Sequence, residues 1–343
     1  MREGCVSVQR EQGAAMIRRR DVLMQTAALA AASALARIAP ARAQDAWPQR
    51  TVSIVVPFAA GGSADLLGRL LAQHLQAKFN VPFIVENRGG AGGSIGTGVV
   101  AKAAPDGHTL LLGTVSTHAI NPSLYARLPF DVEKDFVPIS LLVRLPNLLV
   151  VNNSVPAKTV PELIAWLKAN DGKVSFGSSG NGTSSHLAAV MFQLATGTHM
   201  THVPFRSTAD EMNSMMGGSI QLAIDSMTTI WPLAKGGQVR AIAVSTPQRV
   251  AAAPDVPTIA ESVPNFEATG WQGLYAPGGT PRPVVEKIAA EVKRIFSEPQ
   301  VVTALANVGG EPAPMTPDAF AAFARTERAK WAEVVKAAGV RIE

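Results

Sequence analysis

The chain has 343 residues, of which 47% are hydrophobic and 17% charged, so it is long enough to bury one or two sizeable cores. Its net charge of +5 comes mostly from residues 1–43; the rest holds 24 Lys and Arg against 23 Asp and Glu. This near-neutral balance argues against binding to nucleic acids or membrane surfaces. The single cysteine, Cys5, also lies in the first segment, which leaves no disulfide, thiolate nucleophile or cysteine metal site elsewhere.

Residues 1–43 have the pattern of an export signal. Three consecutive arginines at 18–20 precede an Ala/Leu-rich stretch at 26–36, and Ala41-Arg42-Ala43 forms a small-x-small cleavage sequence. The apolar stretch is too short to cross a bilayer. We therefore expect a twin-arginine or Sec-type signal peptide that directs the protein to the periplasm, with Met16 as a possible true start. An N-terminal anchor helix is the alternative.

Residues 51–79 predict a strand, a glycine loop and a helix. The β-branched run at 51–56 is typical of a strand buried on both faces, and Pro57 ends it. A loop of small residues follows, and the helix begins near Ser63 with one expected apolar stripe, formed by Leu66, Leu67, Leu70, Leu71 and Leu75. The start of such a helix presents unpaired N–H groups, and Gly61 and Gly62 leave them accessible. The pattern predicts an anion-binding site.

The next segment, residues 81–117, continues the alternation. We expect strands at 81–88 and 109–113 with a helix at 99–104 between them, which together with the first unit indicates a parallel sheet covered by helices. Ligands bind such sheets beyond the carboxyl ends of the strands, where Ser116 and Thr117 would lie, although both could be ordinary turn residues. The sequence from Gly96 to Ala101 resembles a dinucleotide-binding motif. It follows a loop rather than a strand and lacks the later acidic residue, so we expect no nucleotide cofactor.

A second unit of similar design begins after a long or broken strand at 139–151 and a helix at 161–169. Residues 173–176 predict a strand, residues 177–182 a loop rich in Gly and Ser, and the following segment a helix. Thr183, Ser184 or Ser185 would cap that helix, and Gly197 would end it. A second anion-binding loop is therefore expected, in what the pattern indicates is a second domain.

The remaining residues predict strands at 202–205, 220–224, 239–245 and 271–276, and helices at 209–216, 282–297 and 317–338. A proline-rich stretch at 254–264 is suited to a crossing between domains. Alternating strands and helices, with two similar loop–helix units, predict two α/β lobes with a cleft between them.

Two other kinds of chemistry have weaker support. A serine hydrolase could use Ser179 or Ser184 with His186, but the sequence lacks a G-x-S-x-G elbow, and His186 more simply contacts its own loop. His199 and His202 have neither carboxylates nor cysteines nearby, so we expect no metal site.

Two acidic residues have open roles. Asp65 could be an acid, although an Asp in the first turn of a helix usually complements the helix dipole. Asp225, at a strand end that faces the cleft, is compatible with either a ligand contact or a structural role.

Eight segments carry a resemblance to a known family over the whole chain after the signal. The chain resembles the substrate-binding proteins of the tripartite tricarboxylate transporter system, the Bug receptors of Gram-negative bacteria. The segments are VVPFAAGGSAD, VENRGGAGGSIG, PDGHTLLLGT, NPSLYARLPFDVEKDFVPIS, FGSSGNGTSSHLA, HVPFRS, VRAIAVSTPQRVAAAPDVPTIAES and WQGLYAPGGTP.

The resemblance implies a fold of the type II periplasmic binding proteins, with two α/β lobes joined by crossover strands: residues 44–143 plus 265–343 as lobe 1 and 144–264 as lobe 2. It implies a monomeric receptor that is not an enzyme, needs no cofactor and delivers a small organic carboxylate to the membrane permease of a transporter. A sensory receptor of the same fold, which would dock a signalling protein, is an alternative.

The resemblance also implies that the ligand binds in the cleft between the lobes, with some of its contacts made through ordered water molecules. The contacts it implies are Phe58, Ala59, Gly61, Gly62, Ser63, Asp65, Ser116, Ser178, Ser179, Gly180, Thr183, Ser184, His186, Phe205, Arg206 and Asp225. Two positions depart from the family pattern, because Ala60 replaces the usual proline and Ser207 the usual glycine. Because of these two substitutions, the resemblance defines the fold more closely than it defines the ligand.

Overall fold

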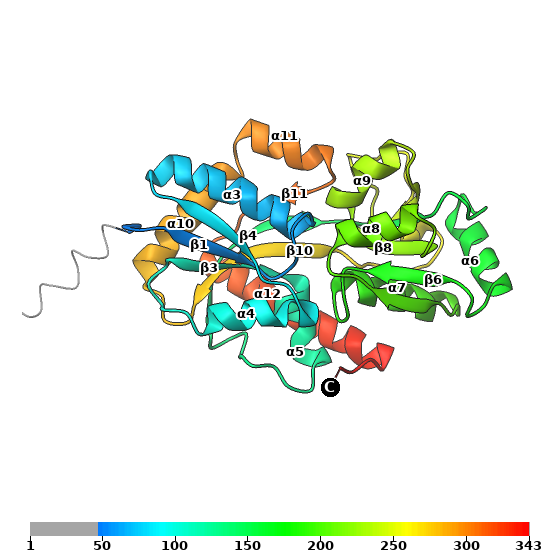
Figure 1. The fold of residues 1–343 in the computed structure, drawn as a ribbon, viewed down its shortest axis with the longest axis horizontal. Coiled ribbons are helices and arrows are strands. Elements are labelled where there is room, and N and C mark those ends of the chain that lie inside the picture. The colour runs from blue at the N-terminus through cyan, green and yellow to red at the C-terminus, as the bar shows by residue number, and fades with distance from the viewer. Residues whose placement is uncertain (1–46, 343) are drawn as a thin grey trace, which may run out of the picture. The chain divides into compact units, whose positions relative to one another are not determined.

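The computed structural model describes residues 47–342, which form one compact unit (Figure 1). The predicted signal segment, residues 1–43, lies outside the described residues.

The first lobe is built on a six-stranded sheet in the order β11-β4-β10-β3-β1-β2. Strands β1, β2 and β3 are mutually parallel, whereas β10 runs antiparallel to β3 and β4, and β11 antiparallel to β4. Their bounds are β1 (Val52–Val56), β2 (Phe83–Asn87), β3 (Thr109–Thr114), β4 (Phe136–Leu145), β10 (Gly270–Pro277) and β11 (Glu311–Pro312). The first three strands therefore end at the same edge of the sheet, as expected.

Helices cover both faces of this sheet (Figure 1). On one face lie α3 (Ser63–Phe79), α10 (Arg282–Ile295) and α11 (Pro299–Asn307); on the other lie α4 (Ser94–Ala101), the short α5 (Asn121–Leu124) and α12 (Pro317–Ala338). Within β1, Ile54 and Val56 belong to the core under α3, while Val55 belongs to the core under α12. This arrangement explains the continuous apolar run of β1, because both of its faces are buried.

The second lobe is built on a five-stranded sheet in the order β7-β6-β8-β5-β9. Its strands are β5 (Asn147–Val151), β6 (Ser175–Ser178), β7 (Thr201–Pro204), β8 (Leu222–Ser226) and β9 (Arg240–Val244). The cores on its two faces include α6 (Val160–Ala169) and α7 (Ser184–Thr196) on one side, and α8 (Thr208–Met216) and α9 (Met227–Lys235) on the other. The predicted fold class, two α/β lobes, is confirmed.

The chain crosses between the lobes at two places that are joined by hydrogen bonds. The first crossing is Pro146, between β4 and β5, and Asn147 follows it. The Asn147 side chain donates to the carbonyl of Ala268 on the return crossing at 2.6 Å, and Ser245 Oγ donates to the same carbonyl at 2.8 Å. The exact lobe limits proposed from the sequence, 143/144 and 264/265, stay predictions.

Several local predictions were wrong. Leu66 is 53% exposed, because the buried face of α3 is formed by Leu67, Leu71 and Leu75 with small residues between them. The helix predicted at 99–104 begins at Ser94, where Gly96 allows close packing: a Cβ there would lie 2.5 Å from the carbonyl oxygen of Arg88. Helices α5, α9 and α11 were not predicted.

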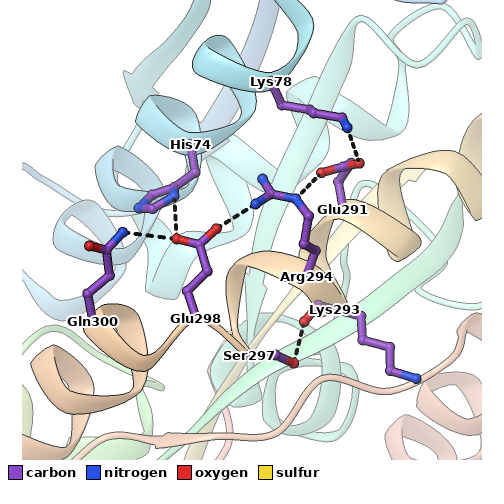
Figure 2. Close-up of polar contacts among 8 residues, drawn as sticks. All are labelled: His74, Lys78, Glu291, Lys293, Arg294, Ser297, Glu298 and Gln300. Carbon is purple, nitrogen blue, oxygen red and sulfur yellow. Dashed lines mark hydrogen bonds and ion pairs between the residues drawn. The ribbon is translucent and has the colours of Figure 1, made fainter.

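Charged side chains connect the outer surface of α3 to α10 and α11, as Figure 2 shows. Lys78 lies 3.3 Å from Glu291, and Arg294 pairs with Glu291 at 2.7 Å and with Glu298 at 2.6 Å. His74 lies 3.5 Å from the same Glu298. Surface ion pairs each contribute about 0–1 kcal/mol, so this alternating row adds little to the stability of the fold.

The close contact between β10 and α12 gives a test of the packing in lobe 1. A Cβ at Gly273 would lie 2.2 Å from the ring of the fully buried Phe320. We expect Gly273→Ala to lower the free energy of unfolding by about 1–3 kcal/mol, since the ring must shift. The control Gly217→Ala, where the nearest atom would be 3.5 Å away, should change it by less than about 0.5 kcal/mol. Equal urea midpoints for the two variants would contradict this packing.

Candidate functional site

A cavity of about 60 Å³, which we call the front cavity, lies between the ends of the strands of both sheets. The residues that line it are Phe58, Gly62, Ser63, Ala64, Thr114, Val115, Ser116, Leu145, Asn147, Ser179, Ser184, Ser207, Thr208, Asp225, Ser226, Gly270, Trp271 and Gln272. Most of them are small or carry hydroxyl groups. Asp225 is the one charged residue in this set, which contains no Lys or Arg.

Four helices begin at the front cavity. Ser63 starts α3, Ser184 starts α7, Thr208 starts α8, and Ser226 immediately precedes α9; all four line the cavity. The N-terminus of a helix carries partial positive charge and free N–H donors. The lining therefore attracts an anion without any cationic side chain.

The loop before α3 leaves donors of that helix uncapped. Gly62, the N-cap residue, has extended backbone angles (φ −87°, ψ 173°), and no side chain caps the helix. The positive φ in this loop, +87°, belongs to Gly61. A Cβ added at Gly62 would meet no atom within 4 Å. The N-terminus of α3 is thus open to a guest in the cavity.

Asp65 has a structural role in this loop. Its carboxylate accepts from the Gly61 N–H at 3.0 Å and from Arg69 Nε at 3.1 Å, and it is not part of the cavity lining. Burial alone would raise the pKa of Asp65, but the hydrogen bonds from Arg69, Gly61 and Asn87 outweigh burial and lower this pKa. The carboxylate therefore fixes the conformation of Gly61.

The loop before α7 is held by its own hydroxyl groups. The Thr183 side chain caps α7 by accepting from the N–H of His186, as one of the sequence alternatives proposed. Ser179 N–H donates to Ser185 Oγ at 3.1 Å. The N–H of Ser184 donates to Ser116 Oγ of the other lobe at 2.9 Å. The lobes thus touch directly at the cavity.

Two stacked histidines support this loop from beneath. The rings of His186 and His202 lie 4.0 Å apart with planes inclined by 11°. His186 Nδ1 accepts from the Gly182 N–H at 3.2 Å, which confirms that His186 contacts its own loop. His202 Nε2 lies 2.6 Å from Ser178 Oγ, but Ser178 is fully buried and lies outside the cavity lining. The contact between Ser178 and His202 therefore lies outside the cavity.

Seven of the ligand contacts expected from the sequence line the front cavity: Phe58, Gly62, Ser63, Ser116, Ser179, Ser184 and Asp225. Nine do not: Ala59, Gly61, Asp65, Ser178, Gly180, Thr183, His186, Phe205 and Arg206. Most of these nine have hydrogen bonds within or beside the two loops; for example, Phe205 N–H donates to Ser178 O at 2.9 Å. Arg206 is exposed. Their role as ligand contacts stays a prediction.

Several lining residues were missed. Ser207 caps α8 by accepting from the Asp210 N–H, and the spacing of Ser207 and Asp210 is a capping pattern that could have revealed it. Ser226 directly follows Asp225 at a strand end. Gln272 and Trp271 lie within β10, whose sequence has no feature that marks them. They reach the cavity because β10 pairs with β3 in the sheet.

A larger cavity, of about 760 Å³, which we call the rear cavity, borders the crossings and shares Gly270 and Trp271 with the front cavity. Charged side chains line it, and several are already paired: Lys330 with Glu267 at 3.1 Å, and Arg249 with Glu261 outside the lining at 2.9 Å. No α-helix among the described residues begins in this lining. The front cavity is therefore the candidate ligand site, because four helices begin there.

Residues 47–342 contain no group of three or more His, Cys, Asp and Glu side chains placed to hold a metal ion. Each helix in this part of the chain is too short or too polar to span a bilayer.

Two α/β lobes joined by hydrogen-bonded crossings, with a cavity lined by helix N-termini from both lobes, define a solute-binding protein of the two-lobed class. The chain belongs to the tripartite tricarboxylate transporter receptor family: the family described as "Tripartite tricarboxylate transporter family receptor" matches residues 67–340. It is 35% identical over 312 residues to the protein BugT of Bordetella pertussis, covering 90% of this chain and 96% of the relative.

Two solved structures with bound acids share the fold. Rpa4515 of R. palustris with adipate has 34% sequence identity and a TM-score of 0.84, covering 86% of this chain and 99% of that chain. MatC of Rhodopseudomonas palustris with bound malate has 32% identity and a TM-score of 0.80, covering 84% and 100%. These relatives confirm the resemblance seen in the sequence.

The histidine stack predicts acid sensitivity. Burial lowers the pKa of His186 to about 4, and burial together with repulsion from His186 lowers the pKa of His202 to about 3. Both rings are neutral in the folded protein, whereas the unfolded chain takes up protons near pH 6.5. Their contribution to stability is therefore complete above pH 6.5 and is lost as the pH falls towards 4 and 3.

We expect the NMR resonances of these two rings not to titrate between pH 8 and 5, with His186→Asn and His202→Gln used to assign them. The melting temperature of the wild type should fall more steeply below pH 6.5 than that of the variant that carries both His186→Asn and His202→Gln. A titration midpoint near 6.5 for either ring would contradict the prediction.

Proposed function

We propose that the chain is an exported, monomeric receptor of the periplasm that captures a small organic carboxylate and delivers it to the membrane permease of a tripartite tricarboxylate transporter. The observation that carries the proposal is the meeting of four helix N-termini at a cavity whose lining has no Lys or Arg. Two relatives with the same fold hold the carboxylic acids adipate and malate.

The uncapped start of α3 is where a carboxylate would bind first. Gly62 and Ser63 place backbone N–H groups at the cavity, and no side chain of the described residues caps them. A carboxylate oxygen would supply the missing cap, with a contribution of about 0.3–2 kcal/mol from each helix terminus. Serine and threonine hydroxyls around it can donate further hydrogen bonds, directly or through ordered water.

Capture requires the lobes to separate and close again. In this structure the Ser184 N–H already donates to Ser116 Oγ across the cavity. A carboxylate that enters would compete for this N–H, and both lobes would then contact the ligand. The hydrogen-bonded crossings at Asn147 and Ala268 are the natural hinge for this motion.

Two alternatives give different experimental results. A periplasmic hydrolase would need an exposed serine activated by histidine, whereas the serine in contact with a histidine, Ser178, is fully buried. Turnover of activated esters by the purified protein would support that alternative. A sensory receptor would bind the same ligand but dock a signalling protein, so co-purification from a membrane extract with a permease subunit separates it from a transport receptor.

The first test is selectivity for anions. A carboxylate at a hundred times its dissociation constant adds about 2.7 kcal/mol of stability, which raises the melting temperature of a chain this long by roughly 4 °C. We expect at least one acid in a panel of small mono-, di- and tricarboxylates to do so, and the matching amides to have no effect. A panel in which only amides or sugars raise the melting temperature would refute the function.

The second test fills the cavity at the start of α3. Gly62→Val should abolish carboxylate binding without unfolding the protein, because the new side chain points into open space and covers the N–H groups. The matched control is Gly217→Val at the end of α8, also at a negative φ. Calorimetry on both variants measures the effect. A folded Gly62→Val protein with unchanged affinity would move the site elsewhere, with the rear cavity as the next candidate.

A further inference from the structure

A buried glutamate without any donor lies beneath the front cavity. Glu211, on α8, is fully buried, and neither of its carboxylate oxygens accepts a hydrogen bond from the described residues. Its side chain packs against Gly177 of β6, where an added Cβ would lie 2.7 Å from its Cγ. An ionised carboxylate in this position would carry an uncompensated charge inside the protein.

Gly177, on which Glu211 packs, pairs with Ala223 of β8, two residues before Asp225, so the two carboxyls lie close together. Asp225 accepts from Ser226 N–H at 2.6 Å and from Thr208 Oγ1 at 3.2 Å. Because Asp225 accepts from these donors and Glu211 accepts from none, the negative charge of the pair belongs on Asp225 and the proton on Glu211. Burial, and then the nearby charge of Asp225, raise the pKa of Glu211 well above its usual value.

The acceptor count on Asp225 leaves room for a ligand. A carboxylate has about four lone-pair positions, of which Ser226 and Thr208 occupy two and a protonated Glu211 would occupy a third. Asp225 lines the front cavity, so the remaining position can face a guest. Gln272 supplies a second, independent sign: it is 4% exposed, lines the same cavity, and its Oε1 has no donor among the described residues.

We propose that Glu211 and Asp225 form an acid–carboxylate pair at the floor of the front cavity, which selects carboxylates that also carry a hydroxyl or ammonium group. This inference rests on the proposed function and specifies its ligand class. The carboxylate of the ligand binds at the starts of α3 and α7, and its hydroxyl or ammonium group donates to Asp225. Glu211 acts as a positioning residue: it donates to Asp225 and keeps the pair at one negative charge.

Few other charges face the pair. α8 packs on β6, β8 and α9. β6 has no titratable side chain, β8 has Asp225 alone, and α9 has Lys235, whose ammonium lies over the Trp231 ring. On α8 itself, Asp210 is exposed. His202, on the neighbouring strand β7, contacts Ser178.

The first experiment tests the proton on Glu211 without any ligand. Above pH 4.5 the wild type must take up a proton when it folds, a requirement that Glu211→Gln removes. The stability that Glu211 contributes is therefore complete below its unfolded pKa and is lost as the pH rises towards its folded pKa.

Thermal melts of both proteins from pH 5 to 8 measure this effect. The melting temperature of Glu211→Gln minus that of the wild type should rise by roughly 2 °C or more for each pH unit. The control Asp210→Asn, an exposed carboxylate on the same helix, should show no such rise. Parallel curves for Glu211→Gln and the wild type would mean an ionised Glu211 and overturn the pair.

The second experiment tests the ligand class with succinate and malate, which differ by one hydroxyl. By calorimetry, the wild type and Asp210→Asn should bind malate at least tenfold more tightly than succinate, as expected for a hydrogen bond to a charged group. In Asp225→Asn the ratio should fall to about threefold or less. An unchanged ratio in Asp225→Asn, a wild type that prefers succinate, or a wild type that binds neither acid would overturn the ligand class. The proposed function fails separately, when the whole carboxylate panel leaves the melting temperature unchanged.

Discussion

The starts of four helices meet at one small cavity, and the way their first N–H groups are satisfied decides what the site can do. α7 and α8 are capped by Thr183 and Ser207, and the N–H of Ser226 before α9 is occupied by Asp225. α3 alone among the four has neither a side-chain cap nor a carboxylate acceptor at its N-cap. An unpaired buried N–H group costs free energy, and the uncapped N–H groups of α3 lie where a bound ligand could accept their hydrogen bonds.

The crossings between the lobes explain how one cavity can serve both lobes. Pro146 cannot donate to a neighbouring strand, so the sheet of lobe 1 ends there and that of lobe 2 begins at Asn147. Asn147 and Ser245 share the carbonyl of Ala268, which keeps both crossings together. Trp271, just after the return crossing, lines the cavities on both sides and donates to Glu327 of α12 at 2.9 Å. Movement at the crossings therefore reshapes both cavities at once.

Features that depend on neighbouring residues could be predicted from the sequence, and those that depend on pairing between distant segments could not. The strand–loop–helix of residues 52–79, the Thr183 cap and the Gly197 terminus follow local patterns and were found. Leu66 was wrongly predicted to be buried, because the five leucines of α3 are compatible with two different buried faces. The face that packs against the sheet is the one in which small residues lie between the leucines. Gln272 donates to Ser63, 209 residues away, and no local pattern marks such a pair. The same is true of Glu211, whose partner Asp225 lies on another element.

An acidic residue in the lining of an anion receptor is consistent with the arrangement of the charges. Asp225 lies against the starts of α8 and α9 through Thr208 and Ser226, so its charge is balanced locally by two of the four helix dipoles. A second charge on Glu211 would exceed what these termini can balance, and its proton removes that charge. The starts of α3 and α7 then remain for the ligand. In the proposed arrangement, an anion binds at Gly62 and Ser184, and a hydrogen-bond donor of the ligand binds at Asp225 and Gln272. A guest with a carboxylate at one end and a donor at the other satisfies both parts in a single orientation.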